Sequence, residues 1–293
     1  MINYNTLPDY AARKVIINEL CKCFKSIRHY FVGESICKRE IDVLQIGNTK
    51  NTVLFCGGFH GMEYLTVLAL LKYAEECALA LKNEDEPLSN ALKIRGVTIV
   101  PCVNPDGVEI AINGSCAALN FKELVEKVCT NTKYWQANAA GVDINHNFDA
   151  GWCELRQKEI ELGINGPSPT RFGGKTPHSE PETKALVKLC GSINFERAIA
   201  FHSQGREIYF SYGEHTPRLC SVLAQRFADV SGYKAAQPED IATGGGFKDW
   251  VIDKLHKPAL TVEIGLGKNP LPLSDFENEY KIVRKILTEA TLL

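Results

Sequence analysis

The sequence lacks the features that mark membrane-spanning, secreted and nucleic-acid-binding proteins. No stretch reaches the roughly 18 uninterrupted apolar residues of a membrane helix. Residues 1–20 contain neither a continuous apolar core nor a small-residue cleavage site, so we read no secretory signal there. The formal net charge is only −2, which gives no strong positive field to attract nucleic acid or an anionic membrane. We therefore expect a cytoplasmic protein with neither nucleic acid nor membrane as partner.

Cysteine, by contrast, is abundant, with 11 residues. A disulfide framework suits a small secreted domain, whereas this chain has 293 residues and no recognisable export signal. Cys21 and Cys23 are separated by one residue in a helix-like segment, and no second pair follows as in a structural zinc site. We interpret the cysteines as mostly buried, reduced thiols.

The pattern of apolar residues predicts alternating helices and strands. With 45% hydrophobic residues and no internal repeat or linker, residues 1–293 are expected to form one α/β domain with a mixed or parallel sheet. The region 130–182 has little periodicity and is interpreted as a long ordered loop, a feature that is usually functional. Helices are expected at 8–31, after Met62, and at 180–193, 217–232 and 275–293, with a polar loop at 83–90. Strands are expected as a pair within 40–56, and at 94–100, 195–203 and 258–265.

The stretch "GGFHGMEYL" (57–65) lies between a short β-branched apolar run and a long run with helical spacing. Its glycines predict a strand-to-helix turn, and α/β folds place their chemistry at such carboxyl ends of strands. His60 and Glu63 would both be presented there. Taken alone this pair is weak evidence, because a lone histidine in apolar surroundings is more often a core residue.

A catalytic zinc ion needs three nitrogen or oxygen ligands and one open position. His202 suits the third place, since it ends an apolar run just before "SQG". Glu263 stands within another strand-like apolar run, where an unpaired carboxylate is costly to bury. It is therefore paired with a lysine such as Lys254 or Lys257, protonated, or directed into a site.

The motifs "HGME", "NPDGV", "GVDINHNFDAGW", "SEPET", "HSQG" and "TVEIG", in this order, resemble the zinc carboxypeptidase (carboxypeptidase A-like) family over nearly the whole chain. More narrowly, "HSQGREIYF", "GGFKDW" and "TVEIGLGKNPLP" are similar to the bacterial γ-D-glutamyl-L-diamino acid peptidases, which trim cell-wall peptides. The resemblance implies a single-domain α/β/α sandwich with a mixed, mostly parallel, twisted sheet. It also implies one zinc ion per chain.

The same resemblance implies the roles of individual residues. His60, Glu63 and His202 would bind the zinc ion. Glu263 would act as the general base, taking a proton from the zinc water and passing it to the leaving amine. Asp143 would accept a hydrogen bond from the far nitrogen of His60 and so hold that ring in one tautomer.

Asn145 would hold a substrate carboxylate or carbonyl beside the metal, but the next position departs from the family pattern. Exopeptidases of the family carry an arginine there, whereas this chain has His146. Histidine offers no bidentate fork and is largely neutral at pH 7. This departure favours an endopeptidase-like substrate or one with an unusual acid.

Other substrate contacts differ as well. Pancreatic enzymes of the family cap the substrate with a tyrosine phenol, and the matching position here, counted back from Asp249, is Ile241. They also stabilise the oxyanion with an arginine, for which Gln136 is the nearest match. The resemblance also implies that Lys248 stands at the base of the pocket for the leaving residue, where it would attract a carboxylate, such as the second one of meso-diaminopimelate. The alternative is a lysine that points to solvent beside an aspartate. Arg171 and Arg206 are further candidate anion contacts.

We therefore expect a cytosolic zinc metallopeptidase that hydrolyses the γ-D-glutamyl–meso-diaminopimelate (or L-diamino acid) bond of small muropeptides during cell-wall recycling. The alternatives are a general metallocarboxypeptidase, a zinc N-acyl amino acid deacylase, and a non-catalytic peptide-binding pseudo-enzyme. "SEPET" and "HSQG" favour the peptidase over the deacylase. The presence of all three ligands and Glu263 argues against the pseudo-enzyme.

Overall fold

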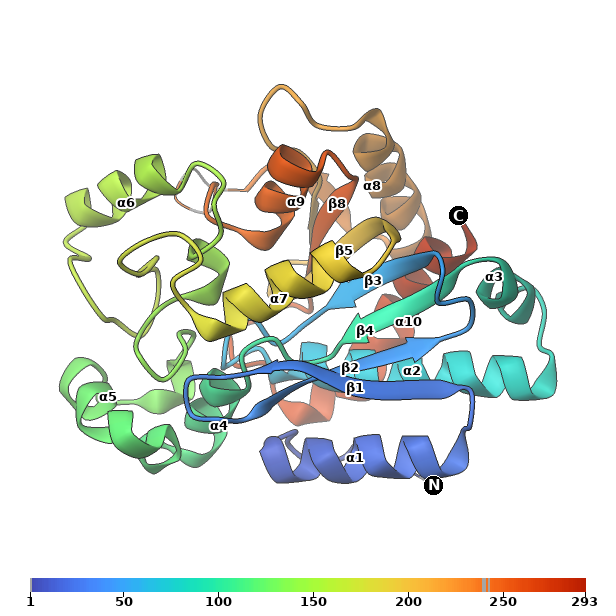
Figure 1. The fold of residues 1–293 in the computed structure, drawn as a ribbon, viewed down its shortest axis with the longest axis horizontal. Coiled ribbons are helices and arrows are strands. Elements are labelled where there is room, and N and C mark those ends of the chain that lie inside the picture. Colours follow the sequence, from blue (N-terminus) through green and yellow to red (C-terminus); the bar gives the residue numbers. More distant parts are fainter. Residues whose placement is uncertain (1, 239–240, 242) are drawn as a thin grey trace.

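The computed structural model describes residues 2–238, 241 and 243–293, which are arranged around one mixed sheet (Figure 1). Its strand order is β1-β2-β4-β3-β5-β8-β6-β7. The central strands β4, β3, β5 and β8 are parallel, while β2 joins β4 and β6 joins β8 in antiparallel fashion. The strands are β1 (Ile27–Glu34), β2 (Glu40–Ile46), β3 (Thr52–Cys56), β4 (Gly96–Val100), β5 (Phe195–Ser203), β6 (Glu207–Tyr209), β7 (Lys234–Ala236) and β8 (Ala259–Ile264).

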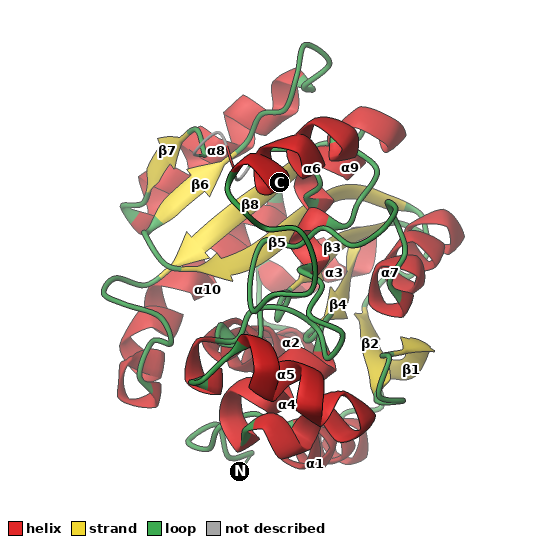
Figure 2. Ribbon diagram, turned by 90° about the vertical axis from the view of Figure 1, so that its left-hand side faces the viewer, coloured by secondary structure: helices red, strands yellow, loops and turns green. Residues whose placement is uncertain are grey.

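Helices cover both faces of this sheet, as Figures 1 and 2 show. One face packs against α1, α2, α8 and α10, and the other against α7 and α9. The expected α/β/α sandwich with a mixed, mostly parallel sheet is thereby confirmed. The helices are α1 (Tyr10–Cys23), α2 (Tyr64–Asn83), α3 (Leu88–Ile94), α4 (Pro105–Asn113), α5 (Lys122–Val128), α6 (Trp152–Glu161), α7 (Pro181–Ser192), α8 (Arg218–Ser231), α9 (Phe247–Leu255) and α10 (Phe276–Leu292).

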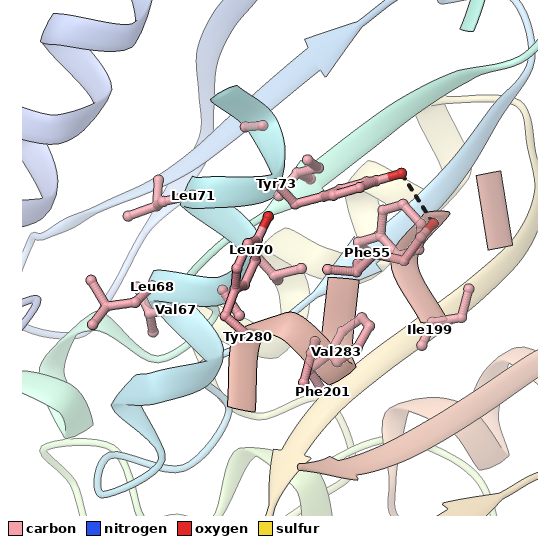
Figure 3. Close-up of a cluster of buried hydrophobic side chains, with 14 of the residues drawn as sticks. Phe55, Val67, Leu68, Leu70, Leu71, Tyr73, Ile199, Phe201, Tyr280 and Val283 are labelled. Atoms are coloured by element: carbon pink, nitrogen blue, oxygen red, sulfur yellow. Dashed lines mark hydrogen bonds between the residues drawn. The ribbon is translucent and has the colours of Figure 1, made fainter. Parts of the chain in front are cut away.

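The alternation of side chains along β3 separates two hydrophobic cores. Phe55 faces α2 and α10, whereas Leu54 and Cys56 face α7 and α9. Phe55 packs edge-on against Tyr73 of α2, with 5.9 Å between the ring centroids (Figure 3). The buried Tyr73 hydroxyl is 2.8 Å from Thr291 Oγ1 of α10, so its polar end is satisfied. Both faces of the central strands are therefore packed against helices.

Two expectations for the N-terminal part were wrong. The helix expected over 8–31 ends at Cys23, and residues 27–34 form the edge strand β1. The aromatic and β-branched residues of this segment fit the spacing of a helix as well as the alternation of a strand, so the sequence did not separate the two. The strands expected within 40–56 exist but do not pair with each other, because β4 lies between them. The N–H of Gly96, at the start of β4, donates to Asn48 O at 3.1 Å and to Asn51 O at 3.0 Å. These bonds to the turn between β2 and β3 help to hold β4 between the two strands.

The two predicted loops also contain helices. The segment 83–90 includes the start of α3, and the region 130–182 includes α6. The rest of 130–182 is held in place by large buried side chains such as Trp135 and Phe148. In Figure 1 this region lies on the side to which the arrowheads of β3 and β4 point. It therefore covers the carboxyl ends of the central strands.

Among the described residues, no helix combines the length and apolar character needed to cross a bilayer.

Glu182 gives the fold a testable pH dependence. It is fully buried at the start of α7, and burial, together with the charge of Asp106, raises the pKa of its carboxyl to about 8. The folded chain keeps a proton that the unfolded chain loses, so the free energy of unfolding falls as pH rises from about 4.5 to about 8. As pH rises between those limits, we expect the free energy of unfolding of Glu182→Gln to increase by about 2 kcal/mol or more relative to that of the wild type.

Urea unfolding near each limit measures this difference. Glu123, which occupies the same position near the start of α5 but is exposed, supplies the matched control Glu123→Gln. A difference between Glu182→Gln and the wild type that does not change with pH would contradict the prediction.

Candidate metal centre

The turn between β3 and α2 brings His60 and Glu63 to the same point. Gly58 adopts a φ of +60°, and a Cβ on Gly61 would lie 2.2 Å from the carbonyl oxygen of Gly107. Both positions therefore require glycine. Glu63 is the residue immediately before the first turn of α2.

His202, near the end of the neighbouring strand β5, completes a three-residue cluster with His60 and Glu63. His60 Nδ1 lies 2.9 Å from Glu63 Oε1, and His202 Nδ1 lies 3.1 Å from Glu63 Oε2. The two Nδ1 atoms are 3.3 Å apart, and all the ligand atoms lie within 4.8 Å of one another. Two imidazole nitrogens and a carboxylate converging on one point form the donor set of a catalytic zinc site. These residues therefore fit a zinc ion.

The groups behind the cluster hold the two rings in place. His202 is buried and stacks on Phe59, with 5.0 Å between the ring centroids. The outer Nε2 of His60 lies 3.1 Å from Asp143 Oδ1, so Nδ1 points inward. The other oxygen of Asp143 accepts a hydrogen bond of 2.9 Å from the N–H of Arg171. Burial acts to raise the pKa of Asp143, but the neighbouring His60, His146 and backbone N–H outweigh it and hold that pKa well below its usual range.

Glu263 lies directly beside this cluster. The register of β5 and β8 pairs it with His202, which places both side chains on the same face of the sheet. Burial and the charge of Glu63 raise the pKa of the Glu263 carboxyl well above its ordinary value. The lysines considered as its partners are engaged elsewhere, because Lys254 pairs with Asp253 at 2.9 Å and Lys257 donates to the carbonyl of Phe195 at 2.5 Å.

A pocket of about 110 Å³ opens next to these residues, which is room for one side chain. Lys248 of α9 lies in its wall and is only 6% exposed, so it does not point to solvent. Its ammonium donates to the carbonyl of Ser211 at 2.7 Å and pairs with Asp249. Besides His60, His202 and Glu263, the lining includes Asn145, His146, Tyr209, Lys248, Asp249 and Thr261.

Three further predicted contacts lie outside the lining of this pocket in the described chain, and one of them, Arg206, pairs with Glu279 at 2.7 Å instead. Gln136 is not part of its lining in the described chain, and its side-chain oxygen accepts a hydrogen bond from the Thr170 hydroxyl. Arg171 is exposed, and only its backbone N–H reaches the site, through Asp143. Their roles as substrate contacts stay predictions.

The structure also adds residues that the sequence did not suggest. Tyr209 supplies a phenol to the pocket from β6, and its hydroxyl donates to Glu207 Oε2 at 2.7 Å. The sequence had instead placed the position of the substrate-capping phenol at Ile241, which is not a tyrosine. Glu159 lies behind His146, with its Oε1 2.7 Å from His146 Nδ1. Neither residue stood out, because β6 has only three residues and α6 is largely polar.

Comparisons with known proteins agree with this geometry. The model of the zinc carboxypeptidase family matches residues 16–285. The chain is 33% identical to γ-D-glutamyl-L-diamino acid endopeptidase 1 of Lysinibacillus sphaericus, over 96% of this chain and 71% of that protein. It is 31% identical to the protein YqgT of Bacillus subtilis (strain 168), over 99% and 78% respectively. The crystal structure of thrombin activatable fibrinolysis inhibitor shares the fold, with a TM-score of 0.77, 19% identity, and coverage of 99% of this chain and 74% of that one.

The pairing of Asp143 with His60 leads to a prediction for metal affinity. Asp143→Asn keeps the size of the side chain but removes the charge that orients the ring. We expect zinc to dissociate about 10–100-fold more readily from this variant. Titration against a competing chelator measures the dissociation constant.

His215→Ala, which changes an exposed histidine, is the control and should bind zinc as the wild type does. Zinc affinity equal to that of the wild type in Asp143→Asn would show that the carboxylate does not orient His60.

Proposed function

The chain belongs to the zinc carboxypeptidase family, and we propose that this zinc-dependent metallopeptidase hydrolyses the γ-D-glutamyl–meso-diaminopimelate (or L-diamino acid) bond of muropeptides. The name of the relative that is 33% identical over 96% of the chain, a γ-D-glutamyl-L-diamino acid endopeptidase, supports this substrate class. The observation that carries the proposal is the buried Lys248 in the pocket beside Glu263.

The proposed chemistry needs one proton carrier close to the metal ligands. His60, Glu63 and His202 would hold a zinc ion, which would supply Lewis acidity to the scissile carbonyl and to a water molecule. Glu263 takes the proton of the attacking water as the new C–O bond forms. It then delivers this proton to the amine nitrogen as the C–N bond breaks. Its position across from His202 in the β5–β8 ladder supports this role.

The environment of Lys248 supports a leaving residue whose side chain ends in a carboxylate. The ammonium has three hydrogens, and its hydrogen bonds in the described chain use two, on Ser211 O and on Asp249. Its nitrogen also lies 5.8 Å from the centre of the Tyr212 ring. One donor is therefore left for a ligand. An apolar side chain in this pocket would cover the remaining N–H donor without giving it a hydrogen-bond partner, which is unfavourable. The distal end of meso-diaminopimelate carries both a carboxylate for Lys248 and an ammonium that suits the adjacent Asp249.

We also propose that the enzyme acts in the cytoplasm, on fragments of the cell wall. All 11 cysteines of the chain are unpaired, as expected of a protein in a reducing compartment.

Zinc-loaded protein incubated with L-Ala-γ-D-Glu-meso-diaminopimelate tests the proposal, with mass spectrometry of the products. We expect free diaminopimelate from the wild type. Glu263→Gln should lower kcat by about 10²–10⁴-fold because it removes the proton carrier. The matched control is Glu207→Gln, which changes the residue opposite Glu263 in the register of β6 and β8. This variant should lose far less of its kcat.

A second arm replaces Lys248. Lys248→Met keeps the length of the side chain and should lower kcat/KM for the diaminopimelate peptide about tenfold relative to the corresponding lysine peptide, which lacks the distal carboxylate. Cleavage of a peptide ending in an apolar L-residue, with the muropeptide left intact, would instead identify a general carboxypeptidase. Cleavage of neither, with zinc bound, would point to a deacylase or a binding module.

A further inference from the structure

The segment 169–173 is anchored next to the metal ligands. The carbonyl of Pro169 accepts a hydrogen bond of 2.9 Å from Gln136 N–H. The carbonyl of Phe172, a buried residue, accepts one of 2.7 Å from Asp143 N–H. Asp143 is also the carboxylate that orients one of the histidine ligands. The backbone of this segment is therefore held by the same loop region that supports the metal centre.

Arg171, in the middle of this segment, has a fixed backbone and a free side chain. Its N–H donates to Asp143 Oδ2 at 2.9 Å, and Oδ1 of the same carboxylate lies 3.1 Å from His60 Nε2. One carboxylate therefore separates the backbone of Arg171 from a metal ligand. The φ of Arg171 is +65°, a conformation that is unfavourable for a residue with a Cβ and that gathers at functional sites. The side chain itself is exposed.

The side chain of Gln136 contributes to this arrangement. Its Oε1 accepts a hydrogen bond from the hydroxyl of Thr170, which immediately precedes Arg171. Gln136 is the nearest match to the oxyanion-stabilising arginine of the family, but an amide carries no charge. The glutamine instead helps to fix the position of a different arginine. The site thus has a guanidinium beside it, displaced from the place that the family pattern gives.

Arg171 differs from other cations near the site because its guanidinium has no hydrogen bond or ion pair within the described chain. Lys248 pairs with Asp249, and Arg206 pairs with Glu279 at 2.7 Å. A guanidinium offers two parallel donors that match the two oxygens of a carboxylate. The free guanidinium is therefore available to a carboxylate of a bound substrate.

We propose that Arg171 binds the α-carboxylate of the D-glutamyl residue on the acyl side of the scissile bond, an inference that rests on the proposed function. A γ-linkage leaves this carboxylate free, with two methylene groups between its carbon atom and the scissile carbonyl. An α-linked peptide has an uncharged amide in place of that carboxylate. Because the leaving residue occupies the pocket beside Lys248, the acyl residue extends away from that pocket, and Arg171 lies outside its lining. Arg171 would therefore select γ-glutamyl substrates over ordinary peptides.

The test compares two substrates that differ only at this carboxylate. One is L-Ala-γ-D-Glu-meso-diaminopimelate, and the other is the same peptide with the α-carboxyl of the D-glutamyl residue converted to a carboxamide. The carboxamide keeps the size of the group and the scissile bond but removes the charge. We expect the wild type to show a kcat/KM about tenfold higher for the carboxylate peptide. The difference should lie mainly in KM, since the carboxylate takes no part in bond breaking.

Three variants separate a direct contact from a structural role. Arg171→Met keeps the length of the side chain and should bring the ratio of the two kcat/KM values close to one, by raising KM for the carboxylate peptide. Arg171→Lys keeps the charge without the fork and should give an intermediate ratio. The matched control is Lys175→Met, which removes another exposed charge of the same loop and should keep the wild-type ratio.

Three results would overturn the proposal. The first is a ratio in Arg171→Met equal to that of the wild type. The second is a ratio that falls as far in Lys175→Met, because the preference would then come from the overall charge of the loop. The third is a loss of kcat for both peptides at an unchanged ratio, which would assign the guanidinium to the scissile carbonyl.

Binding without turnover distinguishes this proposal from the function on which it rests. Calorimetry with zinc-loaded Glu263→Gln should show tighter binding of the carboxylate peptide than of the carboxamide peptide, and no such difference once Arg171→Met is added. Peptides that bind in this way but are not cleaved by the wild type would overturn the proposed function alone. Cleavage by the wild type, with equal binding of the two peptides, would overturn the role of Arg171 alone.

Discussion

The site depends on the parallel pairing of β5 with β3 on one side and β8 on the other. The β3–β5 register sets Cys56 beside Ala200, so the turn after β3 delivers His60 next to His202. The β5–β8 register sets His202 beside Glu263. Because side chains alternate along a strand, a slip of one residue in either pairing would send one of these groups to the opposite face. The two hydrophobic cores that fix the registers therefore also fix the metal centre.

Several side chains of the site come from a region outside the sheet. The segment 130–182 covers the carboxyl ends of the central strands and contributes Asp143, Asn145 and His146. Each has a second contact that holds it: Asp143 with His60, Asn145 with Phe247 N–H at 3.0 Å, and His146 with Glu159. A long loop can act as a rigid wall when its polar groups are satisfied in this way. The pocket is thereby shaped without adding a strand or helix to the sheet.

The sequence predicted the parts that leave a periodic or family signal. His60 follows one apolar run and His202 ends another, which suggested a shared site at the strand ends. Glu263 stands within a third run, and the family resemblance implied its place beside them. The helix expected over 8–31 ran into β1 because its apolar residues fit both periods. The pairing of β2 with β4 depends on contacts distant in sequence. Glu159 and Tyr209 come from elements too polar or too short to stand out, and only the folded chain shows that they reach the pocket.

The central claim is that His60, Glu63 and His202, and none of the 11 cysteines, hold the zinc ion. X-ray absorption spectroscopy of the zinc-loaded protein tests this most directly, because it reports the atoms bound to the metal. The account predicts only nitrogen and oxygen ligands, at about 2.0–2.2 Å. Sulfur ligands at about 2.3 Å would contradict it.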